Sequence, residues 1–119
     1  MKYMIMMFGS AGAMMDVKSP GWIKEMIQFM QQLDVDLTSW GEMVFNAGLA
    51  DGGAAKTVRL TDGLPVASDG PYAEAKESLI GYWVLDVENE ARILEIAGQI
   101  VEWSQVVEVR PLAEAPPEV

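Results

Sequence analysis

The chain has 119 residues, half of them hydrophobic, which fits one folded domain with a substantial core and excludes a disordered chain. Its 18 acidic and 8 basic residues give a net charge of −10, which argues against nucleic acid and anionic membrane surfaces as partners. There is no Cys and no His, so disulfides, thiol catalysis, zinc enzymes, Ser-His-Asp hydrolysis and His-ligated haem are excluded. Proton transfer has to use Asp, Glu, Lys, Tyr or water.

Residues 3–8 are apolar without alternation, which predicts a central strand covered on both faces. The run is short and has no clear cleavage site, so it does not indicate a signal peptide. No segment approaches the roughly 20 apolar residues that a membrane helix needs. We therefore expect a cytoplasmic protein without a membrane partner.

Ser19 and Pro20 predict the start of a helix, with a capping hydroxyl followed by Pro at the first helical position. The apolar residues that follow are spaced by three and four and form one helix face: Ile23, Met26, Met30, Leu33, Leu37 and Trp40. Gly41 stands where a left-handed C-terminal cap belongs. Asp34 and Asp36 predict irregular last turns, and they lack the remaining ligands of a calcium loop.

A short strand at 42–45 and a Gly-rich loop at 47–55 are expected next. Residues 56–60 and 64–67 flank Asp62 and Gly63, and this pattern predicts a β-hairpin. A loop at Asp69, Gly70 and Pro71 leads to a second strongly apolar strand at 80–87.

Asn89 caps a second predicted helix, whose apolar face comprises Ile93, Leu94, Ile96, Ala97, Ile100 and Val101. Residues 104–112 are expected to form the last strand, with Glu108 and Arg110 on the face opposite Val107 and Val109. Residues 1–112 then make one domain, followed by a frayed tail at 113–119.

This order predicts an α+β fold, a ferredoxin-like βαββαβ unit with an inserted β-hairpin. Two helices cover one face of an antiparallel sheet, and the other face has no cover within the chain. An apolar sheet face needs a partner, and a homodimer packing sheet against sheet is the simplest one.

The candidate site lies in residues 68–83, where a turn leads through a charged run into an apolar strand. Asp69 is either a general base in a cleft or the cap of its own turn. Lys76, between Glu74 and Glu77, either orients an anionic substrate or belongs to a solvated charged loop.

Four further residues extend this candidate site. Tyr72 and Tyr82 either donate to a developing oxyanion or pack with one end in water. Arg59 is a candidate cleft residue, because strand side chains alternate between the two faces of a sheet. Glu74 is a candidate second carboxylate beside Asp69.

Several blocks resemble the YCII-related family, in its branch named for an Asp-Gly-Pro-Phe (DGPF) motif. They are residues 1–4, 57–60, 68–77 and 107–111, and the resemblance spans about residues 1 to 112. It implies a ferredoxin-like dimeric α/β barrel. It also implies a kinship with enzymes, since some members carry a His-Asp pair in the cleft and one relative eliminates chloride in chlorinated-aromatic breakdown. Some members of the branch are encoded beside, or fused to, extracytoplasmic-function sigma factors.

The chain departs from that pattern in two places. Tyr72 stands where the motif usually has Phe, and Asp69 would be the Asp half of a pair whose His half is missing. Catalysis by the pair therefore does not carry over to this chain.

We expect a homodimeric small-molecule protein with its cleft near the Asp-Gly-Pro motif and no cofactor or metal. If it is an enzyme, its chemistry is acid–base: elimination, isomerisation or proton abstraction. Asp69 would be the base, Lys76 and Tyr72 would assist, and Glu74, Tyr82 and Arg59 would bind substrate. The alternative is a non-catalytic ligand-binding or regulatory module, with an extracytoplasmic-function sigma factor as one partner that the resemblance suggests.

Overall fold

A computed structural model describes residues 1–9, 17–72 and 78–114. In chain order the elements are β1 (Lys2–Gly9), α2 (Pro20–Ser39), β2 (Met43–Gly48), the 3₁₀ turn η1 (Gly52–Ala54), β3 (Lys56–Thr61), β4 (Leu64–Asp69), β5 (Ser78–Asp86), α3 (Glu90–Ser104) and β6 (Val107–Pro111). Within these ranges, neither helix combines the length and the apolarity that a bilayer crossing requires.

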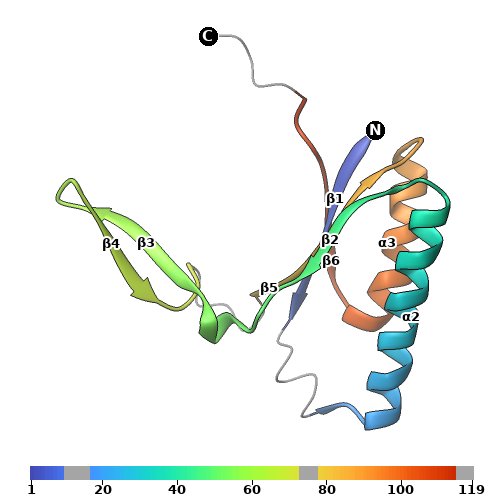
Figure 1. Ribbon diagram of the computed structural model, residues 1–119, viewed down its shortest axis with the longest axis horizontal. Helices are drawn as coiled ribbons and strands as arrows, with labels where there is room; N and C mark the ends of the chain where they lie inside the picture. Colours follow the sequence, from blue (N-terminus) through green and yellow to red (C-terminus); the bar gives the residue numbers. More distant parts are fainter. Residues whose placement is uncertain (10–16, 73–77, 115–119) are drawn as a thin grey trace.

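The main sheet has the strand order β2-β5-β1-β6, and each neighbouring pair is antiparallel. With α2 between β1 and β2, and α3 between β5 and β6, this is the predicted ferredoxin-like α+β fold. β3 and β4 form a separate two-stranded sheet, which confirms the inserted hairpin. Figure 1 shows α2 and α3 side by side on one side of the main sheet.

The core lies between the sheet and the two helices. Its members are buried apolar side chains from β1, β5, α2 and α3, and from the residue that follows β5: Tyr3, Ile5, Leu33, Leu37, Trp83, Leu85, Val87, Ile93, Ile96, Ala97 and Ile100. Tyr3 and Ile5 pair with Leu85 and Trp83, so these four side chains share the helix-facing side of the sheet. Burial of such side chains is the main stabilising contribution to a domain of this size.

Both helices begin where the sequence predicts. The side chain of Ser19 accepts a hydrogen bond from the backbone N–H of Trp22 at 3.1 Å, and Asn89 does the same for Arg92 at 2.9 Å. Gly41 follows α2 with φ +77°, a left-handed conformation that glycine adopts without strain.

Three expectations about the helices were wrong. α2 stays helical to Ser39, because packing of Leu33 and Leu37 outweighs the weak propensity of Asp34 and Asp36. Trp40 comes after the last helical residue and is exposed, with the Arg92 guanidinium over its ring. Leu94 is also exposed, because it lies on the outer side of α3.

Strand boundaries also differ from those expected. β2 continues to Gly48, because its residues up to that point pair with β5. Ser104 ends α3, and Gln105 then takes φ +70° before β6 begins at Val107. A residue with positive φ lets the chain reverse direction after a helix. Because residues 104–106 end the helix and make this reversal, the last strand is shorter than predicted.

The face of the main sheet opposite the helices carries Met4, Met6, Tyr82, Val84 and Phe45, which are paired across three strands. We call this the open face. Neither of the described helices packs against the open face. Within the described residues, β1 is therefore covered on one face only, whereas the sequence predicts cover on both. Glu108 and Arg110 lie beside it on the edge strand β6, opposite Met6 and Met4.

The hairpin β3–β4, which we call the arm, stands away from the main sheet on the side opposite α2 and α3 (Figure 1). Its turn has φ +51° at Asp62 and +78° at Gly63, the two positive values that a two-residue type I′ turn needs. Every residue of β4 is exposed. Four apolar side chains of the arm are exposed: Val58, Leu60, Leu64 and Val66.

Candidate functional site

Asp69 is the last residue of β4 and lies directly opposite Lys56, the first residue of β3. The Lys56 ammonium forms an ion pair with the Asp69 carboxylate. The Asp69 side chain is 85% exposed, so within one chain it is solvated rather than held in a cleft. Its partner is a side chain across the hairpin, a contact that neither interpretation from the sequence included, and the role of Asp69 stays a prediction.

The Asp-Gly-Pro segment is tied to the base of the arm. The Gly70 N–H donates to the Ala55 carbonyl oxygen at 2.8 Å, and the Thr57 hydroxyl donates to the Gly70 carbonyl oxygen at 2.8 Å. Gly70 has φ +97°, a conformation that requires glycine. Pro71 then lines a hollow of about 340 Å³, mainly apolar in its walls, together with residues 49–52, 54–55 and 78–79.

Arg59 and Tyr72 come together on the arm. The guanidinium carbon of Arg59 lies 5.2 Å from the centre of the Tyr72 ring, a cation–π distance. Tyr72 is 79% exposed. The contact keeps a cation and a phenol close to the Asp-Gly-Pro segment, on a surface that this chain alone leaves in water.

The remaining predicted residues are not gathered with these. Tyr82 lies on the open face, where its ring is tilted against Phe45 with 6.0 Å between ring centres. Glu74 and Lys76 fall outside the described residues. The structure therefore groups Asp69, Arg59 and Tyr72 on or beside the arm, and it leaves Tyr82 on the main sheet.

A second polar group, which the sequence did not single out, lies on the helix side of the sheet. Asp34 of α2 accepts two hydrogen bonds through its Oδ1 atom. The Asn46 side-chain amide donates at 2.9 Å and the Trp83 indole N–H at 3.4 Å. These three residues come from α2, β2 and β5, and they line a hollow of about 180 Å³. We call it the α2 hollow.

Two glycines account for the space in the α2 hollow. Gly48 of β2 is paired with Gly81 of β5, and both line it. In antiparallel strands, directly paired residues project on the same face, so neither strand places a side chain there. A Cβ built on Gly48 meets no heavy atom within 4 Å. Met7 and Met30 supply apolar walls.

The sequence held one overlooked signal for this group. Asp34 follows Met30 by four positions, so it lies on the same side of α2 as part of the apolar stripe. An acidic residue at such a position needs a polar partner when the helix packs. Asp36 is half-buried, accepts from the Gln32 amide at 2.8 Å and does not line the α2 hollow, so the two acids do not act together.

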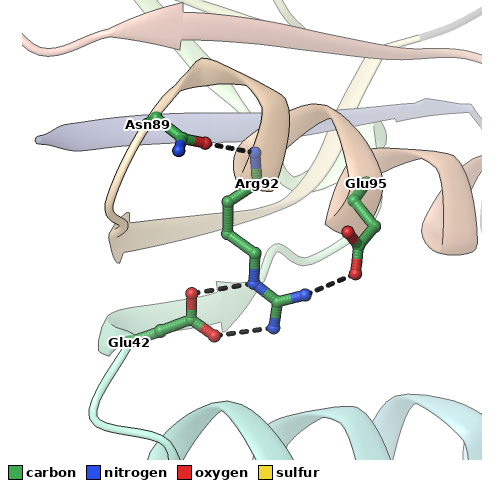
Figure 2. A network of polar contacts seen from close by, with 4 residues as sticks. All are labelled: Glu42, Asn89, Arg92 and Glu95. Atoms are coloured by element: carbon green, nitrogen blue, oxygen red, sulfur yellow. Dashed lines mark hydrogen bonds and ion pairs between the residues drawn. The ribbon is translucent and has the colours of Figure 1, made fainter.

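A charged network holds the segment that enters β2. Figure 2 shows Arg92 of α3 between Glu42 and Glu95, with Asn89 at the start of the helix. Arg92 donates from Nε and Nη2 to the two Glu42 carboxylate oxygens at 2.9 and 2.7 Å, and from Nη1 to Glu95 at 2.7 Å. The pKa of Arg92 is raised, mainly by the hydrogen bond with Glu42. The network fixes β2, the strand that carries Asn46 and Gly48, against α3.

Two comparisons with known proteins bear on this architecture. A family model described as the YCII-related domain matches residues 1–115. A protein of Rhizobium meliloti (strain 1021), described as uncharacterized, is 36% identical over 63 residues. That match covers 50% of this chain and 51% of the relative, so it spans about half the length of each protein.

Proposed function

Because this chain belongs to the family of the YCII-related domain, we propose that it is a homodimeric small-molecule protein. Its two copies pack through their open faces, and its ligand cleft forms where the arm and the Asp69–Gly70–Pro71 segment of one copy meet the second. A cytoplasmic location remains a prediction alongside this proposal.

The observation that carries the proposal is the open face. Met4, Met6, Tyr82, Val84 and Phe45 form a contiguous apolar surface, and Glu108 and Arg110 line its β6 edge. An apolar centre with a charged rim is the usual anatomy of a protein interface. A sheet that is covered on one face only is stabilised when a second sheet packs on the other.

The arm gives a second reason to propose a homodimer. A two-stranded hairpin is marginally stable in water on its own, and this one exposes Val58 and Leu60 from β3 and Leu64 and Val66 from β4. It extends on the side of the open face (Figure 1). A second copy docked there would cover part of the arm and would remove water from Asp69, Arg59 and Tyr72.

In the enzymatic form of the proposal, this burial makes the arm a site for cofactor-free acid–base chemistry. Asp69 would accept a proton from substrate, and Arg59 and Tyr72 would bind or polarise an anionic or carbonyl group. Glu74, Lys76 and Tyr82 are the further residues proposed for this cleft.

A non-catalytic ligand-binding module is the second candidate function. The ion pair between Asp69 and Lys56 favours it, because the carboxylate already has a charged side-chain partner within the hairpin. Binding would then be saturable and would give no product.

Native mass spectrometry on gently purified protein, repeated after denaturation, tests the dimer and the ligand together. We expect a dimer that carries a small extra mass released on denaturation. Val84→Lys places a charge in the middle of the open face and should give a folded monomer. Ile27→Lys, at an exposed site on α2, is the matched control and should remain a dimer.

A wild-type monomer at micromolar concentration would overturn the homodimer. Once a released molecule is identified, Asp69→Asn separates the two forms of the proposal. Loss of turnover with retained dimer supports the enzyme, whereas retained binding with no turnover in either protein supports the binding module.

A further inference from the structure

We infer that the α2 hollow is a binding site for a small primary ammonium compound, held by Asp34. The site lies within one chain and on the helix side of the sheet, and Asp34, its proposed binding residue, belongs to neither the open face nor the arm.

The first argument is charge. Among the residues that line the hollow, Asp34 supplies a carboxylate and no side chain is basic. An anion entering the hollow would meet a negative charge without a compensating cation. A cation gains from the same charge and from a protein with a net charge of −10.

The second argument is hydrogen bonding. One side-chain N–H of Asn46 and the indole N–H of Trp83 donate to Oδ1 of Asp34, which leaves the second amide N–H of Asn46 as the remaining donor of this group. The other Asp34 oxygen, Oδ2, and the amide oxygen of Asn46 have no donor among the described residues. No buried side-chain oxygen in the described chain lacks a partner, so these two atoms are open to solvent. A primary ammonium brings three N–H donors to two unused acceptors.

The third argument is shape. Asp34 is fixed from two sides, by β2 through Asn46 and by β5 through Trp83, so its carboxylate is oriented before a ligand arrives. Pre-orientation lowers the cost of binding. Gly48 and Gly81 leave the floor free of side chains, and Met7 and Met30 offer polarizable walls to a short alkyl group. The hollow of about 180 Å³ suits a ligand of a few carbon atoms.

The probes for this site are n-butylammonium, butan-1-ol and butyrate, which differ in charge but hardly in size. We expect n-butylammonium to shift the NMR signals of the Trp83 indole N–H and the Asn46 side-chain amide in a saturable manner. Butan-1-ol should bind at least about tenfold more weakly and butyrate not at all, because charge-assisted hydrogen bonds are the stronger ones.

Three variants test whether n-butylammonium binds in the α2 hollow. Asp34→Asn removes the charge and should weaken n-butylammonium binding by about tenfold or more. Asp36→Asn makes the same change two residues away, at a half-buried position that does not line the hollow, and should leave binding unchanged. Gly48→Val keeps Asp34 but fills the floor, and it should abolish binding while the fold is retained, since its Cβ meets open space.

The inference is overturned if n-butylammonium causes no saturable shift in the wild-type protein or if butyrate binds as well. It is also overturned if Gly48→Val, or a folded Asp34→Asn, binds like wild type. The wild-type and Gly48→Val measurements decide the matter even if Asp34→Asn does not fold.

Discussion

Arg92 and Glu42 face one another in a two-point ion pair that joins α3 to the chain entering β2. Both guanidinium–carboxylate distances are below 3 Å, and the side chains are only 24% and 15% exposed. A paired geometry of this kind is stronger and more directional than a surface ion pair. It links two elements 50 residues apart in the sequence.

Glu42→Gln should lower the free energy of unfolding by about 1.5–3 kcal/mol, because a partly buried guanidinium loses its charged acceptor. Chemical denaturation of wild type and variant measures the difference. Glu95→Gln is the matched control, since Glu95 contacts the same Arg92 but is 64% exposed, and it should cost less than about 1 kcal/mol. Equal losses in the two variants would contradict the special role of Glu42.

The raised pKa of Arg92 predicts how this contribution depends on pH. A group whose pKa is higher in the folded state contributes fully at pH values below its ordinary pKa and loses the contribution only as pH rises through the raised pKa. Arginine has a very high ordinary pKa, so the Arg92 term is constant between neutral pH and about pH 9. The difference between wild type and Glu42→Gln, measured at both ends of that interval, should be the same.

Asn89→Ala should destabilise the protein by about 0.5–2 kcal/mol, because the N–H of Arg92 loses its capping oxygen. The capped N–H is that of Arg92, the central residue of the charged network in Figure 2. Thermal and urea unfolding measure the loss. Asn89→Ser keeps a capping oxygen and should restore most of the stability, whereas a serine variant as unstable as the alanine variant would argue against capping.

Gly63→Ala should weaken the arm by about 1–2 kcal/mol, since an alanine at φ +78° is strained. Amide hydrogen exchange in β3 and β4 is the measurement, and faster exchange there with little change in the core is expected. Gly53→Ala is the control, because its Cβ meets only an Asp51 carboxylate oxygen at 3.8 Å. Unaltered exchange in Gly63→Ala would show that the turn does not limit the arm.

Leu37→Ala should cost about 2–5 kcal/mol, because the side chain is fully buried and its removal leaves a cavity. Val35→Ala lies on the same helix but at a 60% exposed position, and it should change stability by less than about 0.5 kcal/mol. Urea denaturation distinguishes the two. A loss below about 1 kcal/mol for Leu37→Ala would mean that α2 packs less tightly than the structure shows.

Much of the fold follows from local patterns in the sequence. The helix starts at Ser19 and Asn89 each rest on a side chain three residues from the N–H that it caps, a relationship visible in any sequence. The hairpin turn at Asp62 and Gly63 is equally local. A two-residue turn also fixes which residues face one another, so the pairing of Lys56 with Asp69 followed from the predicted hairpin and was overlooked.

The α2 hollow is different, because it depends on long-range packing. Trp83 reaches Asp34 across 49 residues, and the contact exists only because α2 crosses β5 at that point. The pairing of Gly48 with Gly81 depends likewise on the register between β2 and β5. Neither relationship leaves a periodic pattern in the sequence. The sequence therefore predicts α2, β2 and β5 as elements, but not that they come together at Asp34.

The chain leaves the main sheet and returns to it at nearly the same point, since the Leu49 N–H donates to the Ile80 carbonyl oxygen at 2.8 Å. In topological terms, the arm is therefore a side branch and not part of the path that builds the core. A change in the length or sequence of the arm, or its replacement by a grafted peptide, should therefore leave the packing of β1, β5, α2 and α3 intact. The recognition that we propose for the arm could thus change without altering the stability of the core.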